Sequence, residues 1–537
     1  MYRKYCHITS ILFVLTVCAG RAQTVNFVSS NLPIVRIQTN GQTIPDDPRI
    51  IVQMQIIDNG PGVINYRTDP PLGYNGWISI ETRGSTSQFY YPKKSYGLST
   101  IAGQNNPAQT DVSLLGFPEE NDWVLYAPYP DKTLIRNALA FDLARKTGHY
   151  ASRVRFVELL LNEEYRGVYC LQEKVKRDSA RVRVSKLKPT DTEGDQLTGG
   201  YILKIDKITG NTGPGWNSAQ DSLLFFLHHY PDEEDLAPQQ VAYIRDFVNA
   251  FDAALMTGDP QDTINGYRHF TDPGSFADFL ILQELGRTVD GFRSSTFFYK
   301  DRDSKGGRLH MGPIWDFNLS FGNANYCGAQ AVAGWQHTQN DICSGYYPHV
   351  PLWWEKLLED PWFEALVKCR WTHLRSSILQ PDSINGIIDG YVAELNTPQQ
   401  RNFTRWPILG VYVEWNSFIG QTYASEITYL KDWIADRIAW MDTQWLTMDD
   451  CVVGTGSPAS PVFRLFPNPA HDRLWIEWMQ EGEKNVRILD ARGRALVSRS
   501  TSDYRIQIDC AQWPAGVYFF EIQDRTGRGI RGKFCLN

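Results

Sequence analysis

Long hydrophobic runs are almost absent from this 537-residue sequence. The one strong run, residues 8–19, is shorter than the roughly 20 apolar residues that a membrane-spanning helix needs. It follows two basic residues and precedes Gly20-Arg21-Ala22, as in a secretory signal peptide that is cleaved after Ala22. We therefore predict a signal peptide over residues 1–22 and no transmembrane segment in the mature chain. A lipoprotein anchored through Cys18 is the alternative.

Metal-binding motifs of the CxxC and HExxH types are also absent, which removes the usual signatures of a zinc protein. The only histidine cluster, His228-His229, is expected to be a surface pair. Nine cysteines are present, and two of them lie in the predicted signal peptide. An exported protein can form disulfides, and Cys327 and Cys343 are close enough in sequence for a local bridge. The odd number of remaining cysteines leaves at least one thiol unpaired.

An excess of basic residues is missing as well. The formal net charge is −7, and removal of the predicted signal peptide brings it to about −10. Residues 461–537 hold 12 bases and 9 acids, so the middle of the chain carries about −13. Proteins that bind nucleic acid need a basic field to hold the phosphates. The charge distribution therefore argues against a nucleic-acid partner.

The composition that remains is that of a folded globular protein, with 42% hydrophobic and 21% charged residues. Residues 24 to about 100 alternate polar and apolar, which predicts strands with turns at Asn59-Gly60 and Asn75-Gly76. Further strand pairs follow, with a turn at residues 162–164. Residues 238–448 have a helical period, interrupted by a hairpin that turns at residues 304–307. We predict an α+β body over residues 24–450, strand-rich first and helix-rich second.

The C-terminal residues form a separate unit. A Gly/Ser/Pro-rich linker is predicted at residues 451–462, and alternating segments over residues 463–537 predict a small β-sandwich. The segments "FPNPAHDRLWIEW", "VRILDARGRAL" and "IDCAQWPAGVYFFEI" resemble the type A C-terminal sorting domain of the type IX secretion system. This resemblance implies that the type IX secretion machinery of a Bacteroidetes-type bacterium is a partner. It also implies transit through the periplasm to the cell surface or the medium.

The segment "MGPIWDFNLSFGN" places Asp316 between two aromatic residues. A carboxylate in apolar surroundings must be paired, bound to a metal or protonated, because a buried unpaired charge is costly. Asp290 precedes the predicted hairpin and Asp316 follows it, so the hairpin can bring both acids over one phosphate. One acid would orient an attacking hydroxyl, and the other would bind Mg²⁺. The alternative is that Asp290 caps a turn and Asp316 pairs with an arginine.

A small polar turn upstream, Arg83-Gly84-Ser85-Thr86-Ser87, lies between two predicted strands, and Lys93 and Lys94 open the second strand. Backbone N–H groups of such a turn can bind phosphate, and a lysine ammonium can reach the same anion. The turn lacks the GxGxxG pattern. Taken alone, it is better explained as a hairpin with surface lysines.

Together these segments resemble the CotH-type (spore coat protein H-like) atypical protein kinases. The resemblance also rests on "LLGFPEENDWVLYAPYPDKTLIRNALAFDLARKTGHY", "RFVELLLNEEYRGVYCLQEKVKRD", "LTGGYILKIDK" and "VDGFRSSTFFYKD". It implies a kinase-like two-lobed fold and transfer of the ATP γ-phosphate to protein hydroxyls. The implied cofactors are ATP and Mg²⁺ or Mn²⁺.

The same resemblance assigns roles to particular residues. Asp290 matches the catalytic acid and Asp316 the metal-binding acid. Lys94 is the candidate for contact with the phosphates, and the adjacent Lys93 is the alternative. The remaining candidates around the nucleotide are Arg136, Glu173, Ser85 and Ser87, and the remaining candidate metal ligands are Ser295 and Asn318.

Two of these positions depart from the kinase pattern. Ser295 stands where a kinase catalytic loop usually has asparagine, and Asn318 stands where many relatives have a second acid. Both are weaker metal ligands, so the sequence leaves open whether the protein is an enzyme. The alternative function is a catalytically inactive, kinase-like scaffold that binds glycan or protein at the cell surface. Its contact candidates are residues 323–326 and Trp353-Trp354, although a helical tryptophan pair is more typical of a core.

Overall fold

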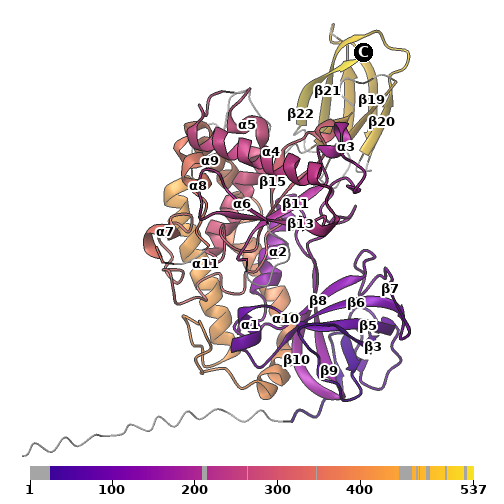
Figure 1. The fold of residues 1–537 in the computed structure, drawn as a ribbon, viewed down its shortest axis with the longest axis vertical. Coiled ribbons are helices and arrows are strands. Elements are labelled where there is room, and N and C mark those ends of the chain that lie inside the picture. Colours follow the sequence, from indigo (N-terminus) through magenta and orange to yellow (C-terminus); the bar gives the residue numbers. More distant parts are fainter. Residues whose placement is uncertain are drawn as a thin grey trace, which may run out of the picture.

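The computed structural model describes the body of the chain over residues 24–208, 215–262, 264–345 and 348–446. In the C-terminal part it describes residues 463–466, 470, 472–478, 484–490, 492–501, 505–524 and 529–536. The predicted signal peptide and the predicted linker lie outside these residues. A strand-rich N-terminal part, a helix-rich second part and a C-terminal strand region follow one another along the chain, which confirms the predicted α+β arrangement (Figure 1).

The N-terminal part is a sheet that closes on itself. Its strands follow the order β5-β3-β2-β9-β10-β8-β6-β7, and β5 also pairs with β6, so the sheet forms a barrel with β7 appended. A small ladder of β1 and β4 lies beside it. The strands are β1 Ser29–Ser30, β2 Ile34–Gln38, β3 Ile50–Ile57, β4 Asn65–Tyr66, β5 Tyr74–Arg83, β6 Ser95–Gly103, β7 Asn106–Gln109, β8 Asp122–Tyr126, β9 Val154–Leu161 and β10 Glu164–Glu173.

Strand alternation separates the two faces of this barrel. Ile78, Leu98, Trp123 and Leu171 come from β5, β6, β8 and β10 and pack together in one buried cluster. Their sequence neighbours, which carry most of the polar residues, must therefore point to the opposite face.

One of the predicted turns in this part is wrong. Asn75-Gly76 is not a turn but lies inside β5, where Asn75 pairs with Gln55 and Gly76 with Met54. Pairing with a neighbouring strand overrides the local turn preference of Asn-Gly. The turn predicted at residues 162–164 is confirmed, with Asn162 and Glu163 both at positive φ between β9 and β10.

A second sheet opens the helix-rich part, with the order β12-β13-β11-β14-β15. Its strands β14 and β15 form the predicted hairpin, which turns through the short helix η2. The sheet's elements are β11 Tyr201–Ile205, β12 Trp216–Asn217, β13 Phe225–Tyr230, β14 Thr296–Lys300, β15 Leu309–Met311 and η2 Asp303–Lys305. Three helices come earlier in the chain: α1 Thr86–Tyr90, α2 Arg136–Lys146 and α3 Gly194–Leu197.

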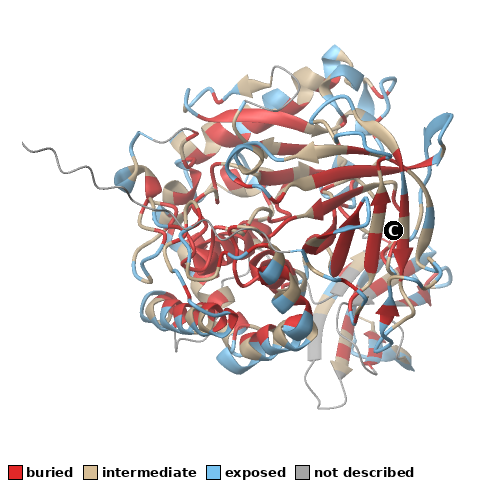
Figure 2. Ribbon diagram, turned by 90° about the horizontal axis from the view of Figure 1, so that it is seen from below, coloured by how far each residue is buried: buried red, intermediate tan, exposed pale blue. Residues whose placement is uncertain are grey.

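The remaining helices surround a large apolar core. The helix α6 is central (Figure 1) and buried along nearly its whole length. Figure 2 shows the buried residues gathered in the interior of the molecule, with the exposed residues around them. It begins with Pro273 after Asp272, whose side chain accepts from the Ser275 N–H at 2.8 Å. Trp353 and Trp354 are buried in the same core. The elements are η1 Glu233–Asp235, α4 Pro238–Thr257, α5 Tyr267–Phe270, α6 Pro273–Gly286, α7 Gln339–Ile342, α8 Trp353–Glu359, α9 Pro361–Arg375, α10 Pro381–Arg405 and α11 Tyr423–Trp445.

The helix α10 fixes the barrel to the helix-rich part. Arg401 on this helix forms a 2.5 Å ion pair with the buried Glu158 of β9. The Oδ1 of the next residue, Asn402, accepts from the backbone N–H of Val168 at 3.1 Å. A buried charge pair with additional hydrogen bonds is strongly geometry-dependent, so these contacts set how the two parts meet. No helix among the described residues is long and apolar enough to cross a membrane.

The C-terminal strands form two sheets, as the predicted β-sandwich requires. One sheet has the order β16-β17-β20 and the other β19-β18-β21-β22. Their inward residues, including Leu474, Ile488 and Phe520, pack into a core of their own. The strands are β16 Phe463–Phe466, β17 Arg473–Trp478, β18 Lys484–Leu489, β19 Ala495–Thr501, β20 Arg505–Asp509, β21 Gly516–Asp524 and β22 Gly529–Leu536.

Candidate functional site

Asp316 lies in the loop that follows the β14–β15 hairpin, and this loop has unusual backbone geometry. Asp316 has φ 65° and Phe321 has φ 49°, while Phe292 and Ser295, in the loop before the hairpin, have φ 67° and 49°. Positive φ is uncommon for residues other than glycine, and such positions concentrate at functional sites. The Arg136 Nε donates to the Ser320 carbonyl at 3.1 Å, which ties the loop to α2.

The Asp316 carboxylate has an unfavourable environment. It is half-buried, and the described residues provide it with no hydrogen bond and no ion pair. Burial raises its pKa to about 7, and the nearby charges of Asp290 and Asp206 act in the same direction. Arg83 and Lys207 lower this pKa only in part. The structure therefore brings Asp290 and Asp316 together across the hairpin, and it does not give Asp316 the arginine partner of the alternative interpretation.

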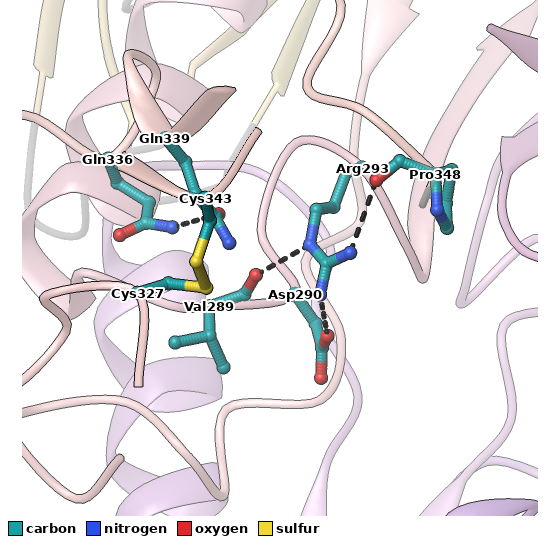
Figure 3. The surroundings of a disulfide bond; sticks show 8 residues. All are labelled: Val289, Asp290, Arg293, Cys327, Gln336, Gln339, Cys343 and Pro348. Atoms are coloured by element: carbon teal, nitrogen blue, oxygen red, sulfur yellow. Dashed lines mark hydrogen bonds and ion pairs between the residues drawn. A yellow bond between two sulfur atoms is a disulfide. The ribbon is translucent and has the colours of Figure 1, made fainter. Parts of the chain in front are cut away.

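Asp290 is held by one neighbour and remains partly accessible. The Arg293 Nη2 donates to the Asp290 Oδ1 at 3.1 Å, and the Arg293 Nη1 donates to the Pro348 carbonyl at 3.1 Å (Figure 3). The Asp290 side chain is 30% exposed. This arrangement fixes one carboxylate oxygen and leaves the other available to a substrate.

The predicted disulfide between Cys327 and Cys343 is confirmed, and it lies close to the segment that carries Val289 and Asp290 (Figure 3). It closes the segment that follows the Asp316 loop. Val289, the neighbour of Asp290, packs in one buried cluster with Ala324 and Ala329, which flank Cys327. The bridged segment therefore forms part of the support of Asp290.

Three cations outside the predicted set lie close enough for their charges to interact, and one of them, Arg83, also acts on Asp316. Arg83 ends β5, Lys174 follows β10, and Lys204 lies on β11. Burial lowers the pKa of each. The charge of Arg83 further lowers the pKa of Lys174 and of Lys204. Acids nearby, Asp122 for Lys174 and Asp206 for Lys204, offset this repulsion in part.

These three residues could have been found only with the fold in hand. Arg83 stands in the small polar turn, and Lys204 and Asp206 stand in the segment "GGYILKIDK". The period-2 alternation gives the face of each strand on which a side chain lies. It does not say which strand face meets the Asp316 loop.

Lys94, the candidate for phosphate contact, has other partners in the structure. Its Nζ donates to the carbonyls of Gln88 and Tyr91, the latter at 2.7 Å, and so binds the C-terminal end of α1. Lys93 is buried, and its Nζ donates to the Val168 carbonyl at 2.6 Å and to the Asn402 Oδ1 at 2.9 Å. The largest charge effects on the pKa of Asp316 come from Asp290, Asp206, Arg83 and Lys207, and from neither of these two ammonium groups.

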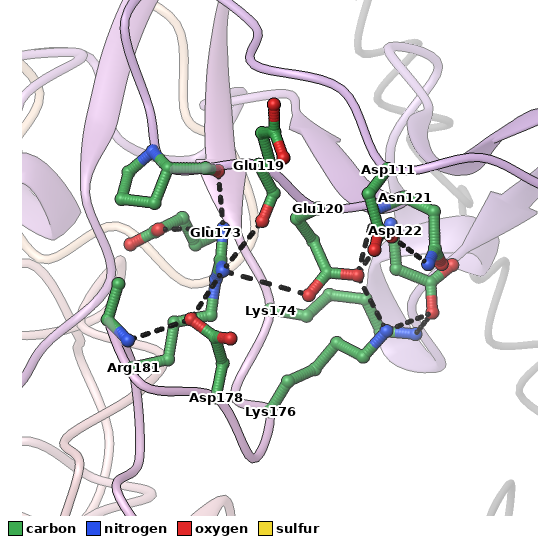
Figure 4. Close-up of polar contacts among 12 residues, drawn as sticks. Asp111, Glu119, Glu120, Asn121, Asp122, Glu173, Lys174, Lys176, Asp178 and Arg181 are labelled. Atoms are coloured by element: carbon green, nitrogen blue, oxygen red, sulfur yellow. Dashed lines mark hydrogen bonds and ion pairs between the residues drawn. The ribbon is translucent and has the colours of Figure 1, made fainter.

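Arg136 and Glu173 are also committed to buried networks. The Arg136 Nη1 forms a 2.6 Å ion pair with Asp131 at the start of α2. Glu173 is fully buried between two arginines, with Arg153 at 2.8 Å and Arg181 at 3.1 Å. Figure 4 shows how Arg181 joins Glu173 to the neighbouring charged residues. In this structure Glu173 supports the barrel end from which Lys174 extends.

The remaining candidates lie near the site but do not form a metal cluster. Ser85 is exposed and Ser87 is half-buried, at the beginning of α1. The backbone N–H of Ser295 lies close enough to Asp206 to lower the pKa of that acid, and the Asn318 carbonyl accepts from the Asn323 Nδ2 at 2.8 Å. Among the described residues, no group of three or more His, Cys, Asp or Glu side chains is placed to hold a metal ion.

A magnesium or manganese ion nevertheless fits this donor set if a nucleotide supplies the other ligands. Mg²⁺ is usually held by one or two carboxylates together with substrate phosphates and water. Asp316 offers a carboxylate without other partners among the described residues, and Asp290 and Asp206 lie close enough to act on its charge. Asp316 would therefore be the principal protein ligand.

The exposure of the side chains tests two further sequence predictions, the surface histidine pair and the contact candidates at residues 323–326. The prediction of a surface histidine pair is wrong, because His228 is only 6% exposed and packs against Trp216 on the covered face of β13. Of residues 323–326, Asn323 and Ala324 are buried, whereas Asn325 is exposed and donates to the Tyr412 hydroxyl at 3.1 Å.

Comparison with known proteins agrees with these features. The family described as "CotH kinase protein" matches residues 80–441, and the family described as "Secretion system C-terminal sorting domain" matches residues 464–536. No curated protein matches the sequence.

Two solved structures show only partial likeness. One is PorZ, a surface component of the type IX secretion system of Porphyromonas gingivalis, with 22% identity, a TM-score of 0.14, and coverage of 16% of this chain and 13% of that one. The other is a DUF3244 protein with an immunoglobulin-like β-sandwich from Bacteroides vulgatus, with 22% identity, a TM-score of 0.13, and coverage of 14% and 83%.

The fold and the family matches together define an exported α+β protein with a sorting tail. Its body belongs to the CotH kinase family, since that family spans residues 80–441 and includes the Asp290 and Asp316 loops. The tail is a type IX secretion sorting domain, which implies secretion to the cell surface or beyond.

Proposed function

We propose that this chain is an exported protein kinase of the CotH type, which transfers the ATP γ-phosphate to hydroxyl groups of proteins with Mg²⁺ or Mn²⁺. The observation that carries the proposal is that Asp316, an acid without a partner among the described residues, lies close to Arg83, whose charge also acts on the half-buried Lys174 and Lys204. The charge of Arg83 lowers the pKa of Lys174 and of Lys204, and Asp316 has no hydrogen bond among the described residues. A metal-bound triphosphate would provide phosphate oxygens for Arg83, Lys174 and Lys204 and a metal ion for Asp316.

Each residue has a distinct part in this proposal. The barrel and the helix-rich part act as the two lobes of a kinase. Arg83, Lys174 and Lys204 bind phosphate oxygens and thereby hold the nucleotide in place. Asp316 would hold the metal ion, which when bound neutralises the phosphate charge. Asp290, with its Oδ1 fixed by Arg293, uses its other oxygen to orient the acceptor hydroxyl.

The route of export belongs to the same proposal. The signal peptide over residues 1–22 delivers the chain to the periplasm, and the tail then directs it through the type IX secretion machinery. The acceptor hydroxyls belong to proteins that share this route or the cell surface.

Transfer of labelled phosphate from ATP is the test of this function. The purified protein is incubated with labelled ATP, Mn²⁺ or Mg²⁺, and an acceptor protein such as casein. We expect labelling of the acceptor or of the chain itself, and loss of that labelling in Asp290→Asn and in Asp316→Asn. A wild-type protein that binds ATP without transfer would instead be the inactive scaffold, consistent with the weak ligands Ser295 and Asn318. A protein that neither binds nor transfers would contradict the proposal.

A further inference from the structure

The hydroxyl of Tyr126 has no hydrogen-bond partner although it lies close to the candidate site. Tyr126 is the last residue of β8 and pairs with Cys170 of β10. Its hydroxyl oxygen is buried, and no described residue accepts or donates a hydrogen bond to it. Buried polar groups are nearly always paired, so an unpaired hydroxyl requires an explanation.

The surroundings of this hydroxyl point to a partner. Strand alternation puts Tyr126 on the same face of β8 as Asp122, opposite the face whose Trp123 and Leu125 fill the barrel. The ionisable groups that act on Tyr126 are Asp131, Asp316, Cys170 and Tyr91.

Among these groups, Asp316 is the one whose acceptors are entirely unused by the described residues and carry a charge. The Asp131 oxygens already accept from Thr133 and Arg136, at 2.5 Å and 2.6 Å for Oδ1. Cys170 is a buried thiol, and the Tyr91 hydroxyl donates to the Glu414 carbonyl. The Asp316 carboxylate accepts no hydrogen bond from any described residue. The Tyr126 hydroxyl, a donor without an acceptor among the described residues, lies on the barrel. The Asp316 carboxylate, an acceptor without a donor among them, lies on the helix-rich part that meets the barrel here.

We propose that Tyr126 is a positioning residue for Asp316, whose carboxylate receives the Tyr126 hydroxyl hydrogen bond when the barrel and the helix-rich part close over a metal-bound nucleotide. The proposal rests on the proposed function, because nucleotide binding is the event that draws the two parts together. The hydrogen bond would orient Asp316 toward the metal and give the Tyr126 hydroxyl the partner that it lacks among the described residues.

The test compares Tyr126→Phe with the wild-type chain. Thermal unfolding without ligand reports on structure, and titration with ATP plus Mn²⁺, followed by the same unfolding signal, reports on affinity. Because the hydroxyl is unpaired without ligand, we expect its removal to leave the unliganded stability unchanged or raised. We expect the affinity for Mn²⁺–ATP to fall about 10- to 100-fold, as for loss of a hydrogen bond to a charged group. Affinity for Mn²⁺ alone should change much less.

Tyr201→Phe is the matched control. The Tyr201 hydroxyl is structural, since it donates to the Leu197 carbonyl at 2.7 Å and the residue is fully buried. This variant should lose stability and keep the wild-type affinity, which is the opposite pattern.

The outcomes separate the two proposals. Equal Mn²⁺–ATP affinity in wild type and Tyr126→Phe would overturn the role of Tyr126 while leaving the proposed function intact. A parallel loss of stability and affinity would also overturn it, because it would assign the hydroxyl a structural role. A wild-type protein that does not respond to Mn²⁺–ATP would remove the proposed function, and the role of Tyr126 with it.

Discussion

Asp290 lies close enough to Asp316, across the β14–β15 hairpin, for its negative charge to raise the pKa of the second carboxyl. The two residues are separated by a whole hairpin in sequence, and only the antiparallel pairing of Phe298 with Met311 and of Lys300 with Leu309 brings their loops together. Two acids that repel each other, with nearby cations that offset this repulsion only in part, lower the stability of the unliganded protein. The same arrangement of charges becomes stabilising when a metal ion and a nucleotide triphosphate bind between these groups.

Neutralising Asp316 should stabilise the unliganded protein. The substitution Asp316→Asn removes a half-buried charge without a partner among the described residues, so at pH 8 we expect unfolding to require on the order of 1–2 kcal/mol more. Asp278 is the control, because it is a buried acid that pairs with Arg370 at 2.5 Å and with His149 at 2.8 Å. Asp278→Asn should lose about 3 kcal/mol. Urea unfolding measures both variants, and a destabilised Asp316→Asn would contradict this description of the site.

Removing Arg83 should weaken nucleotide binding without unfolding the protein. The variant Arg83→Gln loses a charge that acts on Asp316 and repels Lys174 and Lys204, so we expect the Kd for Mn²⁺–ATP to rise about 10- to 100-fold. Lys94→Gln is the matched control, since Lys94 caps α1 and should affect stability slightly and affinity little. Isothermal titration measures the Kd, and the reverse order of effects would restore Lys94 as the phosphate ligand.

Lys93 should make stability depend on pH in the alkaline range. Burial lowers its pKa from 10.5 to about 7 in the folded protein. Between these two values the unfolded chain holds more protons than the folded chain, so stability rises with pH by up to about 1.4 kcal/mol per unit. Below pH 7 both states are protonated and the contribution to the slope ends.

The variant Lys93→Met should flatten this rise, whereas Lys94→Met should keep it. Denaturant midpoints at pH 7, 8 and 9 distinguish the two. A slope unchanged in Lys93→Met would show that another group is responsible.

Loss of the disulfide should lower stability and leave nucleotide binding largely intact. The bridge joins Cys327 and Cys343 at a sequence separation of 16, and a loop of that length contributes about 3 kcal/mol. We expect the double variant Cys327→Ser, Cys343→Ser to lose this amount in urea unfolding. A reductant should destabilise the wild type and not the variant. If the variant also loses Mn²⁺–ATP binding, this prediction is wrong, and the segment between Cys327 and Cys343 is needed for nucleotide binding as well as for stability.

Much of the architecture follows from local patterns in the sequence. Alternation predicts the strands, the helical period predicts the helices, and the hairpin between Asp290 and Asp316 is predicted together with its turn. The closure of the barrel also needs the parallel pairing of β2 with β9, which is not predictable in this way, because strand partners far apart in the chain leave no local mark. Pairing with β3, rather than the local Asn-Gly preference, likewise takes Asn75-Gly76 into β5.

The sequence predicted a residue of the candidate site only where the residue type and its sequence neighbours alone indicate an unusual environment. An acid between aromatic residues, as at Asp316, signals an unusual environment in any fold. A lysine or arginine in the sequence gives no such signal, because its role depends on which acid or carbonyl group it contacts in the folded protein. Lys94 binds backbone carbonyls and Glu173 binds two arginines, whereas Arg83 acts on Asp316. Which of these cations reaches the acid depends on how the barrel meets the helix-rich part.

The most direct measurement of the central claim is the thermal stability of the wild-type protein and of Asp316→Asn with and without ATP plus Mn²⁺. Our account predicts that ligand at a hundred times its Kd stabilises the wild type by about 2.7 kcal/mol. It predicts little or no stabilisation of Asp316→Asn at the same concentrations. No stabilisation of the wild type at millimolar nucleotide, or equal stabilisation of both proteins, would contradict it.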